Sequence, residues 1–304
     1  MEFVVNGITK SFGEKQVLKG ISFSVESGKA MGLLGRNGAG KTTTIRILMD
    51  VFHANSGTIT LDGQPFDARK TQIGYLPEER GLYPKKTVMQ QLVYLARLRG
   101  VSKKDAVAGA EKWLARLGVD QYKNALLETL SKGNQQKVQL ASTLVCDPQL
   151  VILDEPFSGL DPVNSQVLKD VIRELIEAGK LVIFSSHQMS YVEEFCDDIV
   201  IINDGEVVME GDLLTIKREA GKNQYVFGDA KLTPEELGEM IEKQLEGIVT
   251  VEKVRKQDVV VKMCEGVDSN AVITKLLGIN GVTLERMYPY EPSLNDIFVE
   301  KVGE

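Results

Sequence analysis

Hydrophobic and polar residues follow two different periods along this chain, and the change of period divides it into regions. Residues 2–30, with FVVNGITKSF and VLKGISFSVESG, alternate apolar and polar positions between glycines. That period predicts antiparallel strands, which GTITLDG at 57–63 joins. Residues 87–146 carry apolar residues at helical spacing, in VMQQLVYLARL and DAVAGAEKWLARLG, and predict a helical subdomain. Its expected core consists of Leu92, Leu95, Leu98, Trp113 and Leu117.

Three other segments contain short, uninterrupted apolar runs, as is typical of buried parallel strands. They are AMGLLG at 30–35, QLVILDEPFSG at 149–159 and LVIFSSHQ at 181–188. The segment IVIINDGEVVMEG predicts a hairpin that turns at its Asp-Gly pair. We therefore expect an α/β protein with a parallel sheet beside an antiparallel one.

The last part of the chain has its own pattern. Segments with strand, helix, strand, strand, helix and strand character follow one another, which suggests a small ferredoxin-like α+β domain. A chain of 304 residues is long for a single core. We predict two domains, 1–221 and 222–304, with no chemical motif in the second.

Composition narrows the class of protein. With 43% hydrophobic and 26% charged residues the chain is globular, and its apolar runs are too short for a membrane helix. The start MEFVVNGITKSFG lacks the pattern of a secretory signal, so a cytoplasmic location is expected. A net charge of -7 and a pI near 5.2 argue against a nucleic-acid-binding domain. Buried reduced thiols are expected at Cys146, Cys196 and Cys264.

Residues 35–42 match the phosphate-loop pattern G-x-x-x-x-G-K-T. Consecutive backbone N–H groups can curl around a polyphosphate there, and the helix that follows directs its dipole at the phosphates. Lys41 would reach the β and γ phosphates, and the Thr42 hydroxyl would contact Mg²⁺. The alternative is a glycine-rich turn that binds nothing.

Two carboxylates end the second apolar run. Asp154 would hold Mg²⁺ and Glu155 would activate the attacking water, because a strand end at the ligand crevice needs such groups. Alternatively, the pair only marks a strand leaving the core. His187 ends the third run, and a single histidine at a strand end is more often structural than catalytic.

These segments, in this order, resemble the ATP-binding cassette (ABC) family of transport ATPases over roughly residues 2–218. The resemblance implies a P-loop NTPase fold with a RecA-like parallel sheet, an antiparallel β-subdomain and an α-helical subdomain at about 87–146. LSKGNQQ at 130–136 occupies the place of the family's signature, SGLD at 158–161 that of its dimer-contact loop, and IGYLPE at 73–78 that of the loop ending in glutamine.

The resemblance also implies roles for individual residues, with ATP and Mg²⁺ as ligands. Glu155 and His187 would be catalytic, and Thr42, Asp154 and Glu78 would lie at the metal. Phe12 would stack on adenine, although an aromatic in ITKSFG can equally belong to the core. The ATP-binding residues would be Phe12, Gly35, Asn37, Gly38, Ala39, Gly40, Lys41, Thr42, Thr43, Ser131 and Gly133.

Two departures from the family pattern stand out. The usual signature is LSGGQ, so Lys132 replaces a glycine and Asn134 a glutamine, while Ser131 and Gly133 persist. Glu78 stands where glutamine is usual, and a carboxylate near Mg²⁺ changes the local charge.

In the family, the signature faces a partner subunit's ATP, so a head-to-tail homodimer or heterodimer closes two composite sites. The resemblance implies an exporter subunit, peripheral on the inner face of the cell membrane, which drives separate membrane subunits through a groove at the loop ERGLYPKKT. The closest likeness is to sodium-extrusion subunits. Alternatives are a plain surface loop at 79–87, a soluble cassette ATPase acting on ribosomes or nucleic acid, and a nucleotide sensor without turnover.

Overall fold

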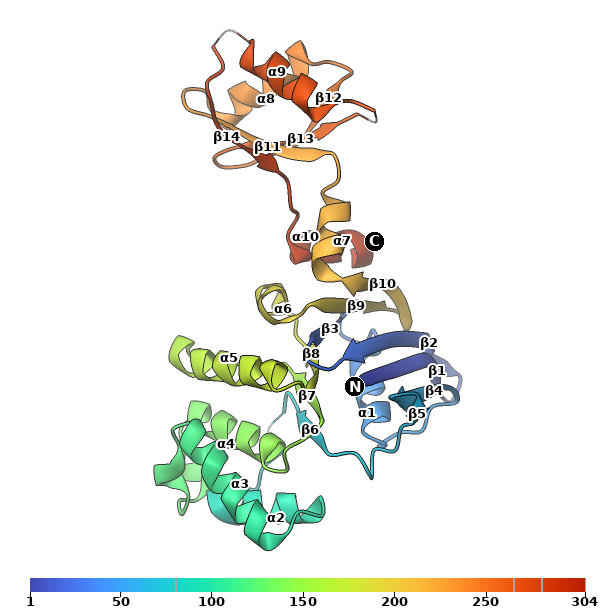
Figure 1. Cartoon of the computed structure of the whole chain (residues 1–304), viewed down its shortest axis with the longest axis vertical. Helices are drawn as coiled ribbons and strands as arrows, with labels where there is room; N and C mark the ends of the chain where they lie inside the picture. The colour runs from blue at the N-terminus through green and yellow to red at the C-terminus, as the bar shows by residue number, and fades with distance from the viewer. Residues whose placement is uncertain (80, 265, 280, 304) are drawn as a thin grey trace. The chain divides into compact units, whose positions relative to one another are not determined.

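The chain folds into two compact units (Figure 1). The first is Met1–Leu213 together with the last residues from Lys301, and the second is Leu214–Glu300. The computed structural model describes four stretches of the chain: 1–79, 81–264, 266–279 and 281–303.

An antiparallel sheet opens the first unit, as the alternation predicts. Phe3 and Val5 on its first strand and Ile21 and Phe23 on its second point inward and are buried. The strand order is β2-β1-β4-β5. The strands are β1 (Glu2–Phe12), β2 (Lys15–Glu26), β4 (Ser56–Leu61) and β5 (Gln64–Pro65).

A second sheet, of order β10-β9-β3-β8-β7-β6, is parallel except at β10. Its strands β3, β7 and β8 are buried at every residue. Their carboxyl ends therefore meet at one edge of the sheet. The predicted hairpin is present, with positive φ at Asp204 and Gly205. The strands are β3 (Ala30–Leu34), β6 (Ile73–Leu76), β7 (Leu150–Asp154), β8 (Leu181–Ser185), β9 (Asp198–Asn203) and β10 (Glu206–Asp212).

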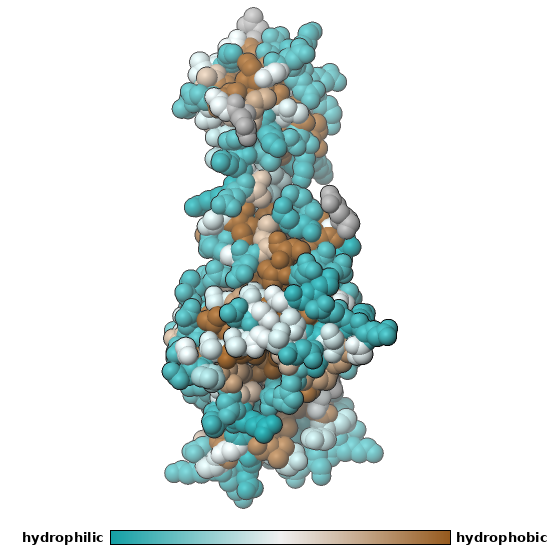
Figure 2. All heavy atoms as spheres, turned by 90° about the vertical axis from the view of Figure 1, so that its right-hand side faces the viewer, coloured by the Kyte–Doolittle hydropathy of each residue, from teal (hydrophilic) through white to brown (hydrophobic). Residues whose placement is uncertain are grey.

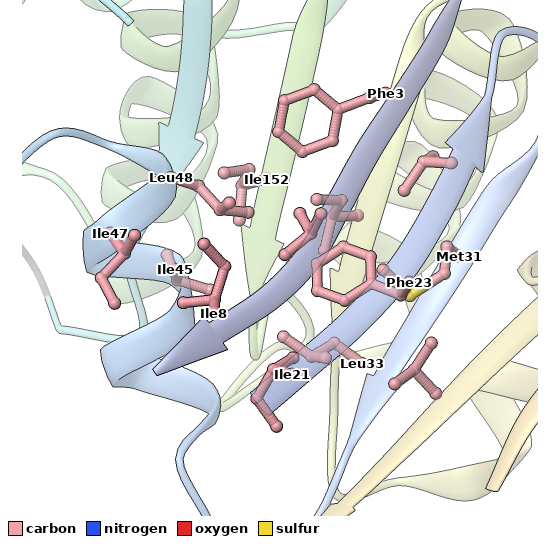
Figure 3. Close-up of a cluster of buried hydrophobic side chains, with 14 of the residues drawn as sticks. Phe3, Ile8, Ile21, Phe23, Met31, Leu33, Ile45, Ile47, Leu48 and Ile152 are labelled. Atoms are coloured by element: carbon pink, nitrogen blue, oxygen red, sulfur yellow. The ribbon is translucent and has the colours of Figure 1, made fainter. Parts of the chain in front are cut away.

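The main core lies where α1 (Lys41–Leu48) meets both sheets. Ile45, Ile47 and Leu48 of this helix are buried in one cluster with Ile8 of β1, and all four are labelled in Figure 3. Burial of each such side chain contributes about 1.5–3 kcal/mol, which fixes the helix and the loop before it. Two further helices belong to this unit: α5 (Pro162–Glu177) and α6 (Met189–Phe195).

Three helices form the predicted helical subdomain and pack together (Figure 1). A capping box at Thr87 starts α2, and Ser102 caps α3. Leu92 and Leu117 are buried as expected, but Leu98 is 65% exposed, so its assignment to the core is wrong. It is the last residue of its helix, where the apolar face turns outward. The elements are α2 (Val88–Leu98), α3 (Lys103–Arg116), η1 (Asp120–Tyr122), η2 (Leu127–Thr129) and α4 (Lys132–Leu144).

The second unit has the predicted β-α-β-β-α-β order and an antiparallel sheet of order β12-β13-β11-β14, which is the ferredoxin-like arrangement. The unit begins at Leu214, before the expected residue 222. Gly221 packs closely within it, since an added Cβ would lie 2.1 Å from the Tyr290 carbonyl oxygen. Its elements are α7 (Leu213–Ala220), β11 (Gln224–Asp229), α8 (Pro234–Gln244), β12 (Val249–Val254), β13 (Val259–Met263), α9 (Ser269–Leu277), β14 (Leu284–Pro289) and α10 (Leu294–Val302).

The surface and the thiols complete the picture. Hydrophilic residues cover most of the face in Figure 2, with smaller hydrophobic areas between them. Within the described stretches, none of the helices has the length and apolarity needed to span a membrane. Cys146 and Cys196 are buried, and burial raises the pKa of the Cys196 thiol. Cys264 is exposed, so the expectation of three buried thiols is wrong for this residue, which follows the last position of β13.

Candidate functional site

The three glycines of the phosphate loop are required for different structural reasons. Gly35, Gly38 and Gly40 all have positive φ, at 154°, 85° and 120°. A Cβ on Gly35 would lie 2.4 Å from the Ile202 carbonyl oxygen, and one on Gly40 would lie 2.6 Å from Leu18. A Cβ on Gly38 would meet nothing within 4 Å. The two end glycines thus anchor the loop to the protein, and Gly38 lies where it opens to the surroundings.

The loop leads directly into the first turn of α1. Gly40 is the N-cap and supplies no side-chain hydrogen bond. The helix therefore begins with backbone N–H groups that no capping side chain satisfies, next to the exposed Thr42 and half-buried Thr43. Asn37 is also exposed, whereas Ala39 is buried. This arrangement is suited to binding an anion.

Lys41 reaches back over the loop. Its ammonium donates hydrogen bonds to the carbonyl oxygens of Gly35 at 2.6 Å and Arg36 at 3.2 Å. Burial lowers the pKa of Lys41, and the negative charges of Glu155, Asp154 and Glu78 oppose that shift. One half-buried cation thus lies within electrostatic reach of three carboxylates.

Asp154 lies at the end of β7 and is 8% exposed. Burial raises its pKa, and the charges of Glu155 and Glu78 act in the same direction. The Tyr75 hydroxyl, on neighbouring β6, donates to Asp154 Oδ2 at 3.4 Å. Burial and the charge of Asp154 raise the pKa of Tyr75 to about 12, so this phenol remains a donor at neutral pH.

Glu155 follows in a left-handed conformation, with φ of 49°. Its carboxylate accepts hydrogen bonds from the Ser186 hydroxyl at 3.2 Å and from the His187 backbone N–H at 2.7 Å. The His187 Nδ1 lies 2.8 Å from the same carboxylate, while that imidazole is 71% exposed. The end of β8 therefore orients Glu155 and leaves one side of His187 open to surrounding molecules.

Glu78 is exposed, in the loop after β6, and its place near Asp154 and Lys41 is electrostatic rather than through a hydrogen bond. Phe12, at the end of β1, is 45% exposed and packs edge-on against Phe52 at 5.2 Å between ring centroids. The alternative that Phe12 is a core residue is therefore wrong. The Lys10 ammonium lies over its ring, 5.1 Å from the centroid.

The signature forms the start of α4. Ser131 is the exposed N-cap, and its hydroxyl accepts from the Asn134 N–H at 3.3 Å. A Cβ on Gly133 would lie 2.5 Å from Asn164 Nδ2, whose amide is bonded to Asp161 of the SGLD loop. In the described part of the chain, no hydrogen bond or ion pair joins Ser131 or Gly133 to the phosphate loop.

The predicted groove loop borders a cavity of about 440 Å³, lined by Tyr83, Lys86, Gln90, Gln91 and Tyr94. The rings of Tyr83 and Tyr94 meet edge-on at 6.4 Å. Gln91 accepts from the Tyr83 N–H at 3.2 Å, but its buried Nε2 has no partner among the described residues. Arg80, also part of the predicted groove, lies outside them.

The structure thus brings Lys41, Asp154, Glu155 and Glu78 together and sets Ser131 and Gly133 at another helix end. The sequence analysis assigned no role to Tyr75 or Ser186, which contact Asp154 and Glu155. Ser186 was detectable in principle, because it immediately precedes His187. Tyr75 lies within IGYLPE, but the motif gave no sign of its contact with Asp154, because that contact joins strands 79 residues apart.

Comparison with known proteins is consistent with this geometry. The family model described as ABC transporter matches residues 18–158, and that of the ATP-binding protein DrrA1-3-like C-terminal domain matches residues 211–302. The uncharacterized ABC transporter ATP-binding protein YhaQ of Bacillus subtilis strain 168 is 42% identical over 301 residues, which cover 98% of each chain.

Two further similarities are informative. The linearmycin resistance ATP-binding protein LnrL of the same organism is 30% identical over 304 residues, covering 97% of this chain and 96% of its own. A solved structure described as the ATP-binding subunit of an ABC transporter is 29% identical, with a TM-score of 0.66 over 73% of this chain and 94% of its own.

Proposed function

This chain belongs to the ATP-binding subunits of ABC transporters, which bind and hydrolyse ATP, and from that premise we propose that it drives export by closing and reopening a head-to-tail dimer. One observation carries the proposal. The chain has two anion-binding helix ends, at Lys41 and at Ser131, which no hydrogen bond or ion pair connects within its described part. Each needs a second copy to be complete.

In this proposal the phosphate loop binds ATP of its own chain. The Lys41 ammonium exchanges its bonds to two loop carbonyls for the β and γ phosphates, which keeps its charge satisfied. Phe12 offers its exposed face to adenine. The signature of the partner copy, through its Ser131 hydroxyl and Gly133 N–H, covers the γ phosphate from the other side. The phosphate-loop residues in contact would be Gly35, Asn37, Gly38, Ala39, Gly40, Lys41, Thr42 and Thr43.

Magnesium fits the donors at this site. Burial raises the pKa of Asp154, and the charges of Glu155 and Glu78 add to that shift, so a divalent cation there would relieve carboxylate repulsion. No cluster of three or more ligand side chains occurs in the described stretches. The Thr42 hydroxyl, Asp154 and Glu78 would therefore share Mg²⁺ with water and phosphate oxygens. The ion would neutralise phosphate charge.

Glu155 is the proposed general base. A water in line with the γ phosphorus would pass its proton to this carboxylate as it attacks. His187 holds Glu155 through its backbone N–H and its ring, and the ring's exposed side would reach the γ phosphate. The base and its orienting group thus come from neighbouring parallel strands, β7 and β8.

The proposed partners are separate membrane subunits that dock at the cavity beside Tyr83 and Tyr94. Two half-exposed tyrosines and the Nε2 of Gln91, which lacks a partner among the described residues, favour a protein segment that offers apolar side chains and one acceptor. The chain would then lie on the inner face of the membrane through these subunits. Linearmycin resistance in the name of a relative favours drug export, whereas sodium extrusion stays a prediction.

The Glu155→Gln variant tests this function. Loss of the base should slow turnover by about 10²- to 10⁴-fold and leave ATP binding intact. The variant should therefore form a dimer with ATP, seen by light scattering coupled to size exclusion, and a monomer without it. Turnover at the normal rate would refute Glu155 as the base, and a monomer at saturating ATP would refute the composite site.

A further inference from the structure

One helix touches both loops that carry the proposed hydrolysis residues. The helix α4 begins at the signature, and two of its glutamines, Gln136 and Gln139, are 7% and 3% exposed. Buried amides of this kind need hydrogen-bond partners. Both find them outside their own helix, on the backbone of the site.

Gln139 holds the loop of Glu78. Its Nε2 donates to the carbonyl oxygens of Pro77 at 3.3 Å and Glu79 at 3.1 Å, one on each side of Glu78. One turn later, the Thr143 hydroxyl donates to the Tyr75 carbonyl oxygen at 3.1 Å. The backbone on both sides of Glu78 is thus fixed to α4 while the Glu78 side chain stays exposed.

Gln136 makes the corresponding contact at the other loop. Its Nε2 donates to the Pro156 carbonyl oxygen at 3.3 Å, immediately after Glu155. Because Glu155 has positive φ, its carboxylate direction depends on the backbone on both sides. The start of α4, one turn earlier, packs Gly133 against Asn164.

We propose that Gln139, supported by Gln136, is a positioning residue that makes α4 and the two hydrolysis loops move together. This inference rests on the proposed function, in which the signature end of α4 contacts the nucleotide of the partner copy. Engagement of that nucleotide then sets the position of Glu78 and Glu155 in the chain's own site. The amides link the two composite sites of the dimer.

The test is a double-substitution cycle on the full-length chain with Mg²⁺ and ATP. Gln139→Met keeps the side-chain volume and removes the donor, and should lower kcat about tenfold with little change in the Kd for ATP. The Hill coefficient for ATP should fall toward one. In a Glu78→Ala background the same substitution should lower kcat by less than about twofold, because the carboxylate that Gln139 positions through the backbone is absent.

Ser142→Ala is the matched control. Ser142 is buried on the same helix, but its hydroxyl donates within that helix, to the Gln139 carbonyl oxygen, so kcat and cooperativity should stay normal. If Gln139→Met unfolds below the assay temperature, Thr143→Val replaces it, because its hydroxyl holds the strand that leads to Glu78.

Equal effects of Gln139→Met with and without Glu78, or an unchanged kcat, would overturn the inference. These outcomes leave the proposed function standing, provided that Glu155→Gln still blocks turnover and traps the dimer. Normal turnover in Glu155→Gln would instead overturn the assignment of the site.

Discussion

The N-terminus of α1 and that of α4 both expose helix N–H groups, but their surroundings differ. The first has a glycine cap without a side-chain hydrogen bond, and Lys41 beside it lies within reach of three carboxylates of the same chain. The second has a serine cap, Ser131, on an exposed surface. Charge and burial concentrate at one end only.

This difference distinguishes a helix end suited to catalysis from one suited only to binding. The end at Lys41 holds groups whose pKa values burial has shifted, as is typical of reacting centres. The end at Ser131 offers a hydroxyl, N–H groups and a helix dipole, which suffice to bind an anion but not to hydrolyse one. In the proposed function the two kinds of end must meet, so each copy would depend on another.

The largest effect should come from Lys41→Ala, which removes the cation from the first end. Without its charge-assisted bonds to phosphate, turnover should fall about a thousandfold or more, and ATP binding should weaken. Steady-state ATPase assays and titration with a fluorescent ATP analogue measure the two losses. Near-normal activity would mean that the comparison places the chemistry at the wrong helix.

The next effect should come from Ser131→Arg at the second end. A bulky cation should block the approach of the partner copy, so ATP-dependent dimers and turnover should be lost while one chain still binds ATP. Ser102→Arg is the matched control, because Ser102 caps α3 through the same kind of bond. Both variants lose a cap worth about 1 kcal/mol, so only a specific role explains loss of turnover in the first alone.

A smaller effect on chemistry should come from Tyr83→Asp, at neither helix end. A charge that docking would bury at the proposed cavity should cut co-purification of the membrane subunits about tenfold or more, with ATP affinity unchanged. Val208→Asp, on the exposed edge strand β10, is the control for added charge. Loss of ATP affinity would instead assign Tyr83 to the nucleotide site.

The smallest effect should be that of Asp154→Asn on stability without ligands. Because the folded state raises the pKa of Asp154, it binds more protons than the unfolded state, and stability falls as pH rises through that range. The amide removes this penalty, so the unfolding temperature at pH 7 should rise by a few degrees while ATPase activity drops. An unfolding temperature that falls would show that the carboxylate is stabilised rather than strained.

Much of the fold could be predicted from local patterns. The buried strands at β3, β7 and β8 and the phosphate loop between β3 and α1 are contiguous in sequence, so composition and period were enough. The ferredoxin-like order of the last unit followed for the same reason.

Contacts between distant segments left no such pattern. Tyr75 meets Asp154, and Gln139 meets the carbonyl oxygens beside Glu78, only because the sheet and α4 bring them together. Every residue type has a backbone carbonyl, so a side chain that hydrogen-bonds to one imposes no recognisable residue pattern on the sequence. The prediction for Leu98 was wrong for a different reason. Helical periodicity identifies the apolar face of a helix, but it does not show where the element that covers this face ends.

The different roles of the phosphate-loop glycines have a consequence for how related sequences can diverge. Gly35 is required by the carbonyl of Ile202 in the adjacent strand, so even a lineage that abandoned nucleotides would have to retain it or unfold. A Cβ on Gly38 would meet open space, so packing in the fold would not prevent its replacement once nucleotide binding was lost. A relative in which Gly38 is replaced and Gly35 is retained would therefore be a protein that lost nucleotide binding and kept the fold.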